Sequence, residues 1–357
     1  MRFITILIIF FLGLIYTSWR IWTILPFPAL WKWGFTFVWI LCFALIFIHY
    51  GLGNRLPLWL AAASYEASTS WIIAFIYVLM LFAALDIGRL VHLVPGSFLR
   101  DSLAGTMTIV ATVSILLFGG WAHYHHKYRE EITLNAGSAP GKPVTVVLAS
   151  DLHLGYHNRA REISRWVDLI NAEDPDLVLF AGDVLDGALR PVREWDYASI
   201  LRRLNAPVYA CPGNHEYISG KDEAFSFLKD AGIHLLVDSS AEVCGIRIIG
   251  RDDRSNRGRK PLAGLAPADS VFTILLDHQP YNLEEAGNCG IDFQFSGHTH
   301  HGQIWPGNWI TDAMYEKAFG RHHRGTTQYY ISSGLGIWGG KFRIGTRSEY
   351  IVLKIKG

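Results

Sequence analysis

Five short polar fragments in the C-terminal part of the sequence carry residue types that bind divalent metals. Each directly follows a short apolar run, and they are Asp151-Leu152-His153, Gly182-Asp183-Val184-Leu185-Asp186, Gly213-Asn214-His215-Glu216, Asp277-His278 and Gly297-His298-Thr299-His300. Imidazole nitrogens and carboxylate oxygens suit Mn, Fe or Zn. A single Asp or His after a strand is usually a turn former or a satisfied polar group. Because the pattern recurs five times, it predicts a site for two divalent ions.

The apolar runs before these fragments are short and alternate with amphipathic stretches. The strand-like runs are Val144–Ala149, Leu177–Phe180, Val208–Ala210, Ile246–Ile249, Phe272–Leu276 and Ile291–Phe295, and the helix-like stretches include Ala160–Asn171 and Ala198–Leu204. Such alternation predicts a layered α/β domain, whose strand ends gather ligands at one edge.

The N-terminal part has a different composition, rich in Phe, Trp, Ile and Leu. Four runs are almost free of charge: Phe3–Tyr16, Gly34–His49, Trp71–Ala84 and Leu103–Trp121. Each extends to nearly the 20 or so residues that a membrane-spanning helix needs, with Trp residues clustered at the ends. We therefore expect a transmembrane region of four helices at 1–122, a juxtamembrane linker at 123–142 and a soluble domain at 143–357.

Four spans place the N-terminus and the soluble domain on the same side of the membrane. Charges near the spans are balanced, with Arg2, Arg55, Lys127 and Arg129 on one side and Arg20, Lys32, Arg89 and Arg100 on the other. Arg2, ahead of the first run, favours the cytoplasmic side. The net charge of +1 and the four cysteines without CxxC spacing indicate neither a nucleic-acid module nor a disulfide framework. Nothing in the sequence indicates an oligomeric state.

With its five fragments in this order, the chain resembles the calcineurin-like metallophosphoesterases over Val144–Lys356. The resemblance implies a two-sheet α/β sandwich flanked by helices. It assigns Asp151, His153 and His300 to a first metal ion, and Asp183 as the carboxylate that bridges both ions. The second ion would be held by Asn214, His278 and His298. Two divalent ions are implied, with Mn expected and Fe or Zn as alternatives.

The resemblance also implies a mechanism. A hydroxide bridging the two ions would attack phosphorus in line. His215 would protonate the leaving oxygen or stabilise its charge, and Asp186 would orient His215. His301, His157, His322 and His323 are not expected to be ligands.

Several residues outside the ligand fragments bear on the choice of substrate. Gly187 stands where phosphoprotein phosphatases of this superfamily carry an arginine, which argues against phosphoprotein substrates. Ser332-Ser333-Gly334-Leu335-Gly336, with Arg343 and Glu349, is similar to membrane-associated bacterial phosphoesterases, some of which cleave the pyrophosphate of a lipid-linked nucleotide. A basic run over residues 251–260 would hold anionic headgroups or a nucleotide diphosphate, or is simply a solvated loop.

The sequence thus predicts an integral, multi-pass enzyme of the bacterial cytoplasmic membrane. It would cleave a phosphodiester or pyrophosphate bond, lipid-diphosphate substrates included, with the lipid bilayer as its partner and no role for nucleic acid. Two alternatives remain open: a broad phosphomonoesterase or nucleotide phosphodiesterase held at the membrane, and a non-catalytic membrane sensor or transporter with a metal-binding domain.

Overall fold

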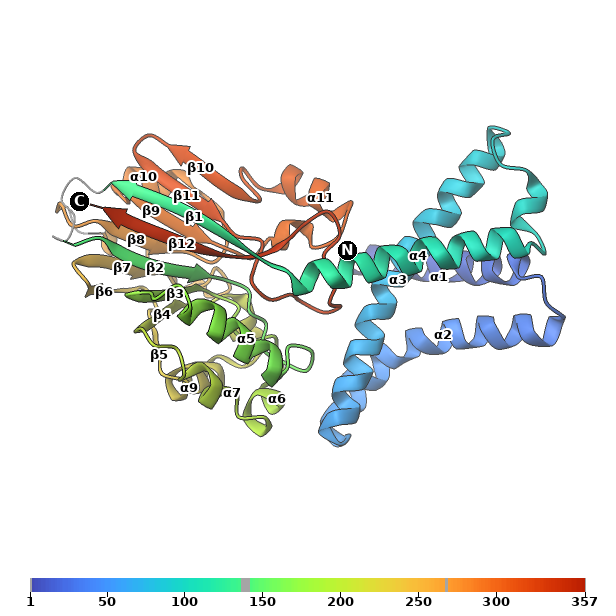
Figure 1. Cartoon of the computed structure of the whole chain (residues 1–357), viewed down its shortest axis with the longest axis horizontal. Helices are drawn as coiled ribbons and strands as arrows, with labels where there is room; N and C mark the ends of the chain where they lie inside the picture. Colours follow the sequence, from blue (N-terminus) through green and yellow to red (C-terminus); the bar gives the residue numbers. More distant parts are fainter. Residues whose placement is uncertain (1, 136–141, 267–268, 357) are drawn as a thin grey trace. The chain divides into compact units, whose positions relative to one another are not determined.

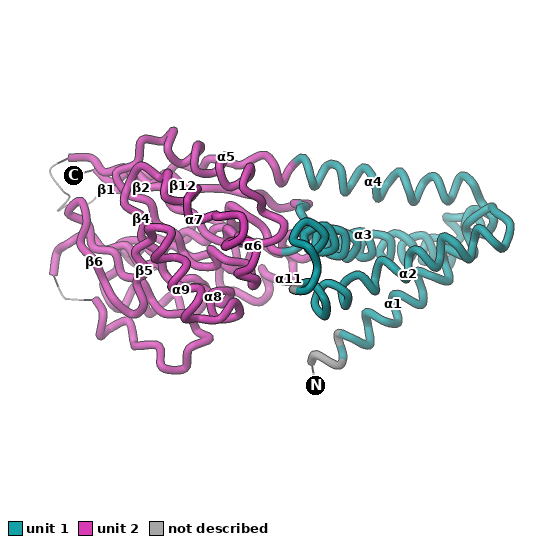
Figure 2. The backbone as a smooth tube through the Cα atoms, turned by 90° about the horizontal axis from the view of Figure 1, so that it is seen from below, with its two compact units in different colours: residues 1–122, 339–342 teal, residues 123–338, 343–357 magenta. Residues whose placement is uncertain are grey.

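The computed structural model describes residues 2–135, 142–266 and 269–356. The chain divides into two compact units, coloured separately in Figure 2. Unit 1 comprises residues 1–122 together with 339–342, and unit 2 comprises residues 123–338 and 343–357.

Unit 1 is built from four long helices, labelled in Figure 1: α1 (Arg2–Ile24), α2 (Ala29–Leu52), α3 (Leu58–Leu90) and α4 (Leu103–His125). Pro28 and Pro57 occupy the N-cap positions of α2 and α3, where a missing N–H costs no helical hydrogen bond. Two short 3-10 helices, η1 (Gly53–Arg55) and η2 (Gly96–Leu99), lie in the connections. All four long helices are long and apolar enough to cross a membrane.

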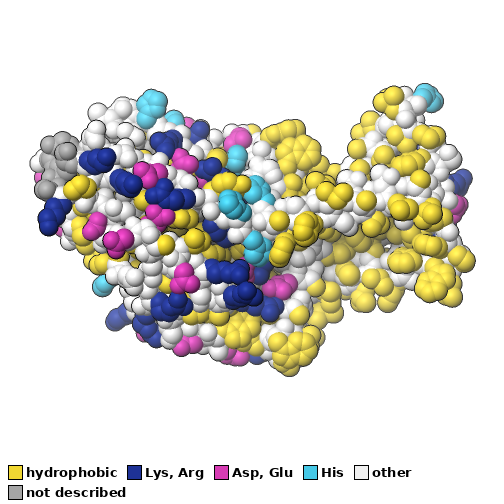
Figure 3. Space-filling model, viewed as in Figure 1, with side chains coloured by type: hydrophobic (Ala, Val, Ile, Leu, Met, Phe, Trp, Pro, Cys, Tyr) yellow, Lys and Arg dark blue, Asp and Glu magenta, His cyan; other side chains and the backbone are white. Residues whose placement is uncertain are grey.

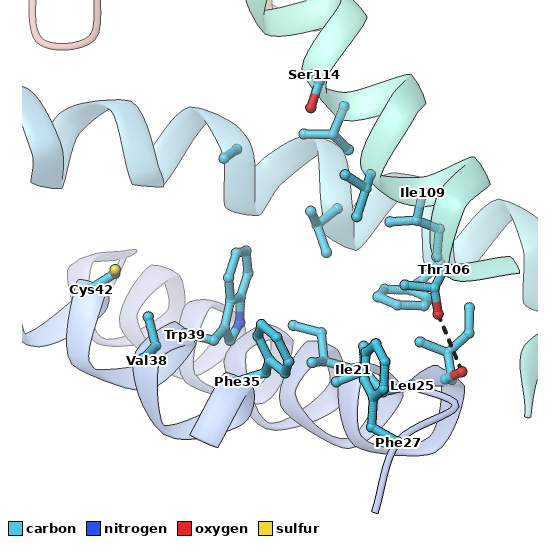
Figure 4. Close-up of a pocket in the computed structure, with 16 residues that line it drawn as sticks. Ile21, Leu25, Phe27, Phe35, Val38, Trp39, Cys42, Thr106, Ile109 and Ser114 are labelled. Carbon is cyan, nitrogen blue, oxygen red and sulfur yellow. Dashed lines mark hydrogen bonds between the residues drawn. The ribbon is translucent and has the colours of Figure 1, made fainter. Parts of the chain in front are cut away.

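The helices of unit 1 pack through aromatic side chains and an ion pair between a buried arginine and a half-buried aspartate. Trp71 and Phe75 of α3 contact Phe10 of α1, with ring centroids 6.3 and 4.7 Å away. Arg20 of α1 is buried and donates through Nε to Asp86 of α3 over 2.7 Å. A cavity of about 520 Å³ opens between α1, α2, α3 and α4, and its walls are almost entirely apolar (Figure 4).

Four residues from the C-terminal part of the chain belong to unit 1. In this segment, Gly339–Phe342, an added Cβ on Gly340 would lie 3.0 Å from the main-chain oxygen of Thr69 and 3.1 Å from Ile73. Lys341 lies 3.6 Å from the Glu66 carboxylate. The chain therefore leaves unit 2 at Trp338 and re-enters it at Arg343.

Unit 2 contains two six-stranded sheets (Figure 1). The first has the order β1-β12-β2-β3-β4-β5 and the second the order β10-β11-β9-β8-β7-β6. The strands are β1 (Lys127–Asn135), β2 (Val144–Ala149), β3 (Leu177–Ala181), β4 (Val208–Cys211), β5 (Ile233–Leu235), β6 (Ser239–Val243), β7 (Ile246–Gly250), β8 (Thr273–Leu276), β9 (Phe293–Ser296), β10 (Gly320–Arg324), β11 (Thr327–Ile331) and β12 (Ser348–Lys356).

Helices are distributed between and outside these strands. They are α5 (Ala160–Asn171), α6 (Leu189–Glu194), α7 (Tyr197–Leu201), α8 (Asn214–Ile218), α9 (Lys221–Asp230), α10 (Glu284–Asn288) and α11 (Gly307–Met314), with the 3-10 helices η3 (Leu262–Gly264) and η4 (His300–Gly302). Side chains alternate along each strand, so that Val146 and Leu148 of β2 join Ile274 and Phe293 in the core between the sheets. Val147 faces the other way, into the core shared with α5 and its Trp166.

The two-sheet fold confirms the architecture that the sequence predicts. One segment differs: residues 127–135, which the sequence analysis assigns to a linker, form β1 and pair in parallel with β12, from Lys127 opposite Ser348 to Asn135 opposite Lys356. The charged residues Lys127, Arg129, Glu130 and Glu131 hide this strand because they occupy an edge, where polar side chains are common. Residues 123–125 of the expected linker complete α4, and residues 136–141 lie outside the described residues.

Candidate metal centre

The candidate ligands stand at the C-terminal ends of neighbouring parallel strands. In the first sheet β2, β3 and β4 are adjacent, and they lead into the loops of Asp151, Asp183 and Asn214. In the second sheet β8 and β9 are adjacent and lead into His278 and His298. Because parallel strands end at one edge of a sheet, this topology brings fragments that are distant in sequence to a common place.

The first set of ligand atoms belongs to Asp151, His153 and His300. The three lie within 4.8 Å of one another. Nε2 of His153 and Nε2 of His300 are 3.0 Å apart, and Oδ1 of Asp151 is 3.5 Å from Nε2 of His300. Two ring nitrogens and a carboxylate that converge in this way fit a divalent cation.

The second set belongs to Asp183, His278 and His298, again within 4.8 Å of one another. One oxygen of Asp183 lies next to both sets: Oδ2 is 3.1 Å from Nε2 of His278 and 3.8 Å from Nε2 of His153. The other oxygen accepts a hydrogen bond from the main-chain N–H of His215 over 2.8 Å. Asp183 is therefore positioned as a bridge between the two sets.

Several buried polar atoms of the site have no hydrogen-bond partner among the described residues. They include Oδ1 of Asn214 and Nε2 of His278. Buried polar groups are almost always satisfied, and the exceptions require a ligand, ion or water. On the opposite side of the His278 ring, Nδ1 donates to the main-chain oxygen of Ala181 over 2.8 Å, which leaves the lone pair on Nε2 for a metal. This donor set fits two divalent ions.

The surroundings of Asp183 and His300 shift the pKa values of both side chains. Burial raises the pKa of the Asp183 carboxyl, but the neighbouring His278 and His153 outweigh burial and hold that pKa below its usual range. Burial also lowers the pKa of His300 well below its usual value, and His153 and Arg343 lower it further. His300 is therefore a neutral imidazole with a free lone pair, the form that binds metal.

Backbone conformation and close packing also shape the site. Asp151, His153, Asp183, His298 and His300 all adopt left-handed conformations, with φ between 46° and 71°. Such conformations are uncommon outside glycine and concentrate at functional sites. Gly297 allows close approach, because an added Cβ would lie 2.2 Å from Oδ2 of Asp151.

His215 lies beside both sets of ligands. Its ring centroid is 4.6 Å from that of His153 and perpendicular to it. Nδ1 bonds to the main-chain oxygen of Asp186, not to its carboxylate, whose Oδ1 is 4.0 Å away. The Asp186 carboxylate instead lies 3.4 Å from Nδ1 of His153 and 3.7 Å from Nδ1 of His157. Asp186 thus contacts His215 through its backbone and the candidate ligand His153 through its side chain.

Glu216 holds two of the ligand loops together, a contribution that the sequence analysis does not anticipate. It is fully buried and accepts hydrogen bonds from the main-chain N–H groups of Gly213, Asp183 and Leu185, at 2.7, 3.0 and 3.0 Å. A local signal existed, because a Glu three residues after the N-cap of a helix commonly accepts from the N-cap N–H. No local sequence pattern predicts its contacts with Asp183 and Leu185, which lie 33 and 31 residues earlier in the chain.

Arg343 supports the loop of His300. This fully buried guanidinium donates to the main-chain oxygens of His300 and Gly336, at 2.8 and 3.0 Å, and to that of Ser333. Burial lowers the pKa of Arg343 to about 10. The loop of Ser333 and Gly336 also approaches Asp151, since Gly336 N donates to the Asp151 main-chain oxygen over 3.0 Å.

Much of the basic run at 251–260 is engaged inside the protein. Arg251 lies 3.5 Å from the buried Asp277 and 2.7 Å from Glu285, and Arg259 also pairs with Asp277. Arg254 lies over the ring of Tyr281, 4.7 Å from its centroid. Arg251 and Arg259 therefore neutralise the carboxylate of Asp277, which precedes His278.

His301, expected not to be a ligand, belongs to neither set of ligand atoms. Its Nε2 lies 3.4 Å from Asp312.

A two-sheet α/β domain with two converging sets of carboxylate and imidazole groups defines the class of this protein, and comparisons with known proteins agree. Residues 144–302 match the model of the calcineurin-like phosphoesterase family, a span that contains all seven candidate ligands with His215 and Asp186. A metallophosphoesterase of Aquifex aeolicus is 30% identical over 258 residues, which cover 68% of this chain and 97% of that protein. The chain belongs to the calcineurin-like metallophosphoesterase family.

Two other relatives differ in coverage. A metallophosphoesterase of Helicobacter pylori is 32% identical over 222 residues, but the match spans only 60% of each protein. A Danio rerio protein described as a transmembrane protein with a metallophosphoesterase domain is 28% identical over 330 residues, covering 84% of this chain and 74% of that protein. The aligned 84% of this chain is longer than the segment 123–357, so the similarity extends into the helices of unit 1.

Proposed function

We propose that this protein is a membrane-bound phosphohydrolase that holds two divalent ions and cleaves a phosphodiester or pyrophosphate bond, with lipid-linked substrates as the first candidates. The observation that carries the proposal is the single oxygen of Asp183, 3.8 Å from Nε2 of His153 and 3.1 Å from Nε2 of His278. A carboxylate shared by both ligand sets would let two ions act together on one phosphoryl group, as in two-metal hydrolysis.

The residues divide into two overlapping ligand sets. Asp151, His153, Asp183 and His300 would hold the first ion, and Asp183, Asn214, His278 and His298 the second. Such ions, when bound, lower the pKa of water and neutralise charge on phosphoryl oxygens. Mn is the ion we expect, because imidazole and carboxylate ligands occur together here.

His215 is the proposed proton donor to the leaving oxygen. Its Nδ1 bonds to the Asp186 main-chain oxygen, which can only accept, so Nδ1 carries a proton and Nε2 exchanges the other. This contact fixes the orientation of the ring. Asp186 is the proposed positioning residue, through its backbone for His215 and through its carboxylate for His153.

Membrane attachment is supported by the four apolar helices and by a relative described as a transmembrane protein. We place unit 2 on the cytoplasmic side of a bacterial membrane. Cys244 is an exposed free thiol of unit 2 and can report this sidedness. A membrane-impermeant maleimide should label Cys244 only after the cells are permeabilised, and a Cys244→Ser protein supplies the background. Labelling in intact cells would reverse the assignment.

The activity is tested with bis-p-nitrophenyl phosphate and purified full-length protein, stripped of metal and then given Mn. We expect Mn-dependent hydrolysis that falls at least a hundredfold in Asn214→Ala and in His215→Ala. Asn214→Ala should also bind one ion fewer, whereas His215→Ala should still bind both. His301→Ala is the matched control, because this histidine adjoins a ligand but belongs to neither set. Binding of two ions without turnover would favour the sensor alternative.

A further inference from the structure

Helix α11 exposes large apolar side chains. Trp309, Ile310 and Met314 are 63%, 60% and 62% exposed, and Trp305, just before the helix, is 39% exposed. At 100° per residue, Trp309, Ile310 and Met314 lie within about 140° of the helix circumference. Figure 3 shows hydrophobic side chains gathered over this region. We call these four residues the α11 apolar face.

The polar residues of α11 are Asn308, Thr311 and Asp312, and the side chain of Asp312 is 53% exposed. Asp312 lies 3.4 Å from Nε2 of His301, and the hydroxyl of Thr311 donates to the main-chain oxygen of Asn308 over 3.0 Å. The Oδ1 atom of Asn308 is buried and has no hydrogen-bond partner among the described residues. A surface helix of a soluble domain normally buries its apolar stripe and exposes its polar residues. Helix α11 instead leaves its large apolar side chains exposed, and a cluster of this kind marks a site of contact with another molecule or with a membrane.

The helix adjoins the candidate metal centre at both ends. It begins five residues after η4, which contains His300 and His301. Tyr315 follows the last residue of the helix; its ring centroid is 6.4 Å from that of His298, and its hydroxyl is 3.2 Å from that of Tyr281. Whatever contacts the α11 apolar face is therefore close to the ligands His298 and His300.

The segment before α11 is hydrogen-bonded to the points where the chain leaves unit 2 and returns to it. Gln303 donates to the main-chain oxygen of Trp338, the last residue before the segment Gly339–Phe342 of unit 1. Trp305 N donates over 2.6 Å to the main-chain oxygen of Ile344, two residues after that segment. Residues just before α11 are thus bonded, within unit 2, to the residues that flank the segment Gly339–Phe342.

We propose that the α11 apolar face inserts into the boundary between headgroups and acyl chains of the bilayer, and that the metal centre beside it acts on phosphate groups at the membrane surface. The proposal rests on the membrane-bound phosphohydrolase proposed above. Helices that lie in this boundary typically carry tryptophan next to large aliphatic residues. The four helices of the same chain keep a bilayer permanently available, whereas a soluble partner protein would have to be recruited.

Insertion is measured first without any reference to activity. Full-length Cys244→Ser protein carrying Ile310→Cys is labelled with a nitrobenzoxadiazole thiol reagent and reconstituted into phosphatidylcholine vesicles. Lipids brominated along the acyl chain should quench the label at least twofold relative to unbrominated lipids. The same protein without Ile310→Cys supplies the background from the remaining thiols. An unquenched label, or quenching that varies with the protein-to-lipid ratio and so reports a second copy, would overturn the proposal.

Activity then separates this inference from the proposed function. The double variant Trp309→Ser/Ile310→Ser is compared with wild type on bis-p-nitrophenyl phosphate and on a p-nitrophenyl phosphodiester bearing a hexadecyl chain in vesicles. We expect less than a twofold change on the soluble substrate and at least a tenfold loss on the lipid substrate. Leu169→Ser, which alters another exposed apolar residue of unit 2, should change neither rate. Equal losses on both substrates, or no loss on either, would refute a membrane contact. Failure of the wild type on both substrates would instead refute the proposed function.

Discussion

Replacing Glu216 with glutamine tests whether the buried carboxylate holds the ligand loops of Asp183 and Asn214. Oε2 accepts from the N–H groups of Gly213 and Asp183, and Oε1 accepts from that of Leu185. An amide retains one acceptor oxygen. The orientation of the amide that loses fewer bonds places its oxygen where Oε2 was and keeps the bonds from Gly213 and Asp183. Its NH₂ group then faces the N–H of Leu185. Glu216→Gln therefore leaves one buried donor without an acceptor.

The magnitude follows from the number of unsatisfied groups. One buried unsatisfied N–H costs about 1–3 kcal/mol, so we expect Glu216→Gln to lower the free energy of unfolding of unit 2 by that amount. Glu216→Ala removes acceptors from three N–H groups and should cost about 3–9 kcal/mol, comparable with the whole stability of many domains. Displacement of residues that orient metal ligands typically lowers metal affinity by about 10–100-fold, which we expect for the second ion in Glu216→Gln.

The assay uses a buried thiol. Cys211 ends β4 and is only 1% exposed, so its alkylation in urea, followed by mass spectrometry of the Cys211 peptide, reports unfolding of unit 2 within the full-length protein. Glu194→Gln is the matched control, because Glu194 forms an exposed ion pair with Arg190, worth about 0–1 kcal/mol. If Glu216→Gln matched Glu194→Gln in both urea midpoint and Mn affinity, the support attributed to Glu216 would be refuted.

Three further predictions concern packing, buried charge and metal linkage. Gly297→Ala would place a Cβ 2.2 Å from Oδ2 of Asp151 and should lower affinity for the first ion by at least about tenfold, as measured by competition with a chelating dye. Gly264→Ala, whose Cβ would meet nothing within 4 Å, should leave this affinity unchanged. Equal metal affinities of the Gly297→Ala and Gly264→Ala proteins would contradict the steric argument. Arg343→Met removes the donor from three carbonyl oxygens, of which that of His300 still accepts from Gln303 N, and the two left without it should cost about 2–6 kcal/mol in the Cys211 assay; an unchanged urea midpoint would show that the guanidinium is dispensable. Chelation should destabilise wild-type unit 2 by about 4 kcal/mol per ion present at a thousand times its dissociation constant, and a stability independent of chelator would argue against bound metal.

The sequence was informative wherever the signal was local. The four apolar runs were visible because a membrane span requires a long uncharged segment, and the structure has an α-helix at each. The ligand fragments were visible because each combines rare residue types directly after a strand. Both kinds of pattern depend only on neighbours in the chain. Family membership followed from the order of the fragments and is confirmed by comparison.

Tertiary structure decided the features that depend on partners distant in sequence. The charged strand β1 resembles a linker until its pairing with β12, more than 200 residues away, is known. Asp186 was expected to orient His215; in the fold its main-chain oxygen contacts His215, and its carboxylate lies beside His153. Arg251, a candidate anion-binding residue in the sequence, is engaged by Asp277 and Glu285. The sequence by itself determined which chemical groups are available; only folding determined which of them meet, because hydrogen bonds and ion pairs depend on distance in space.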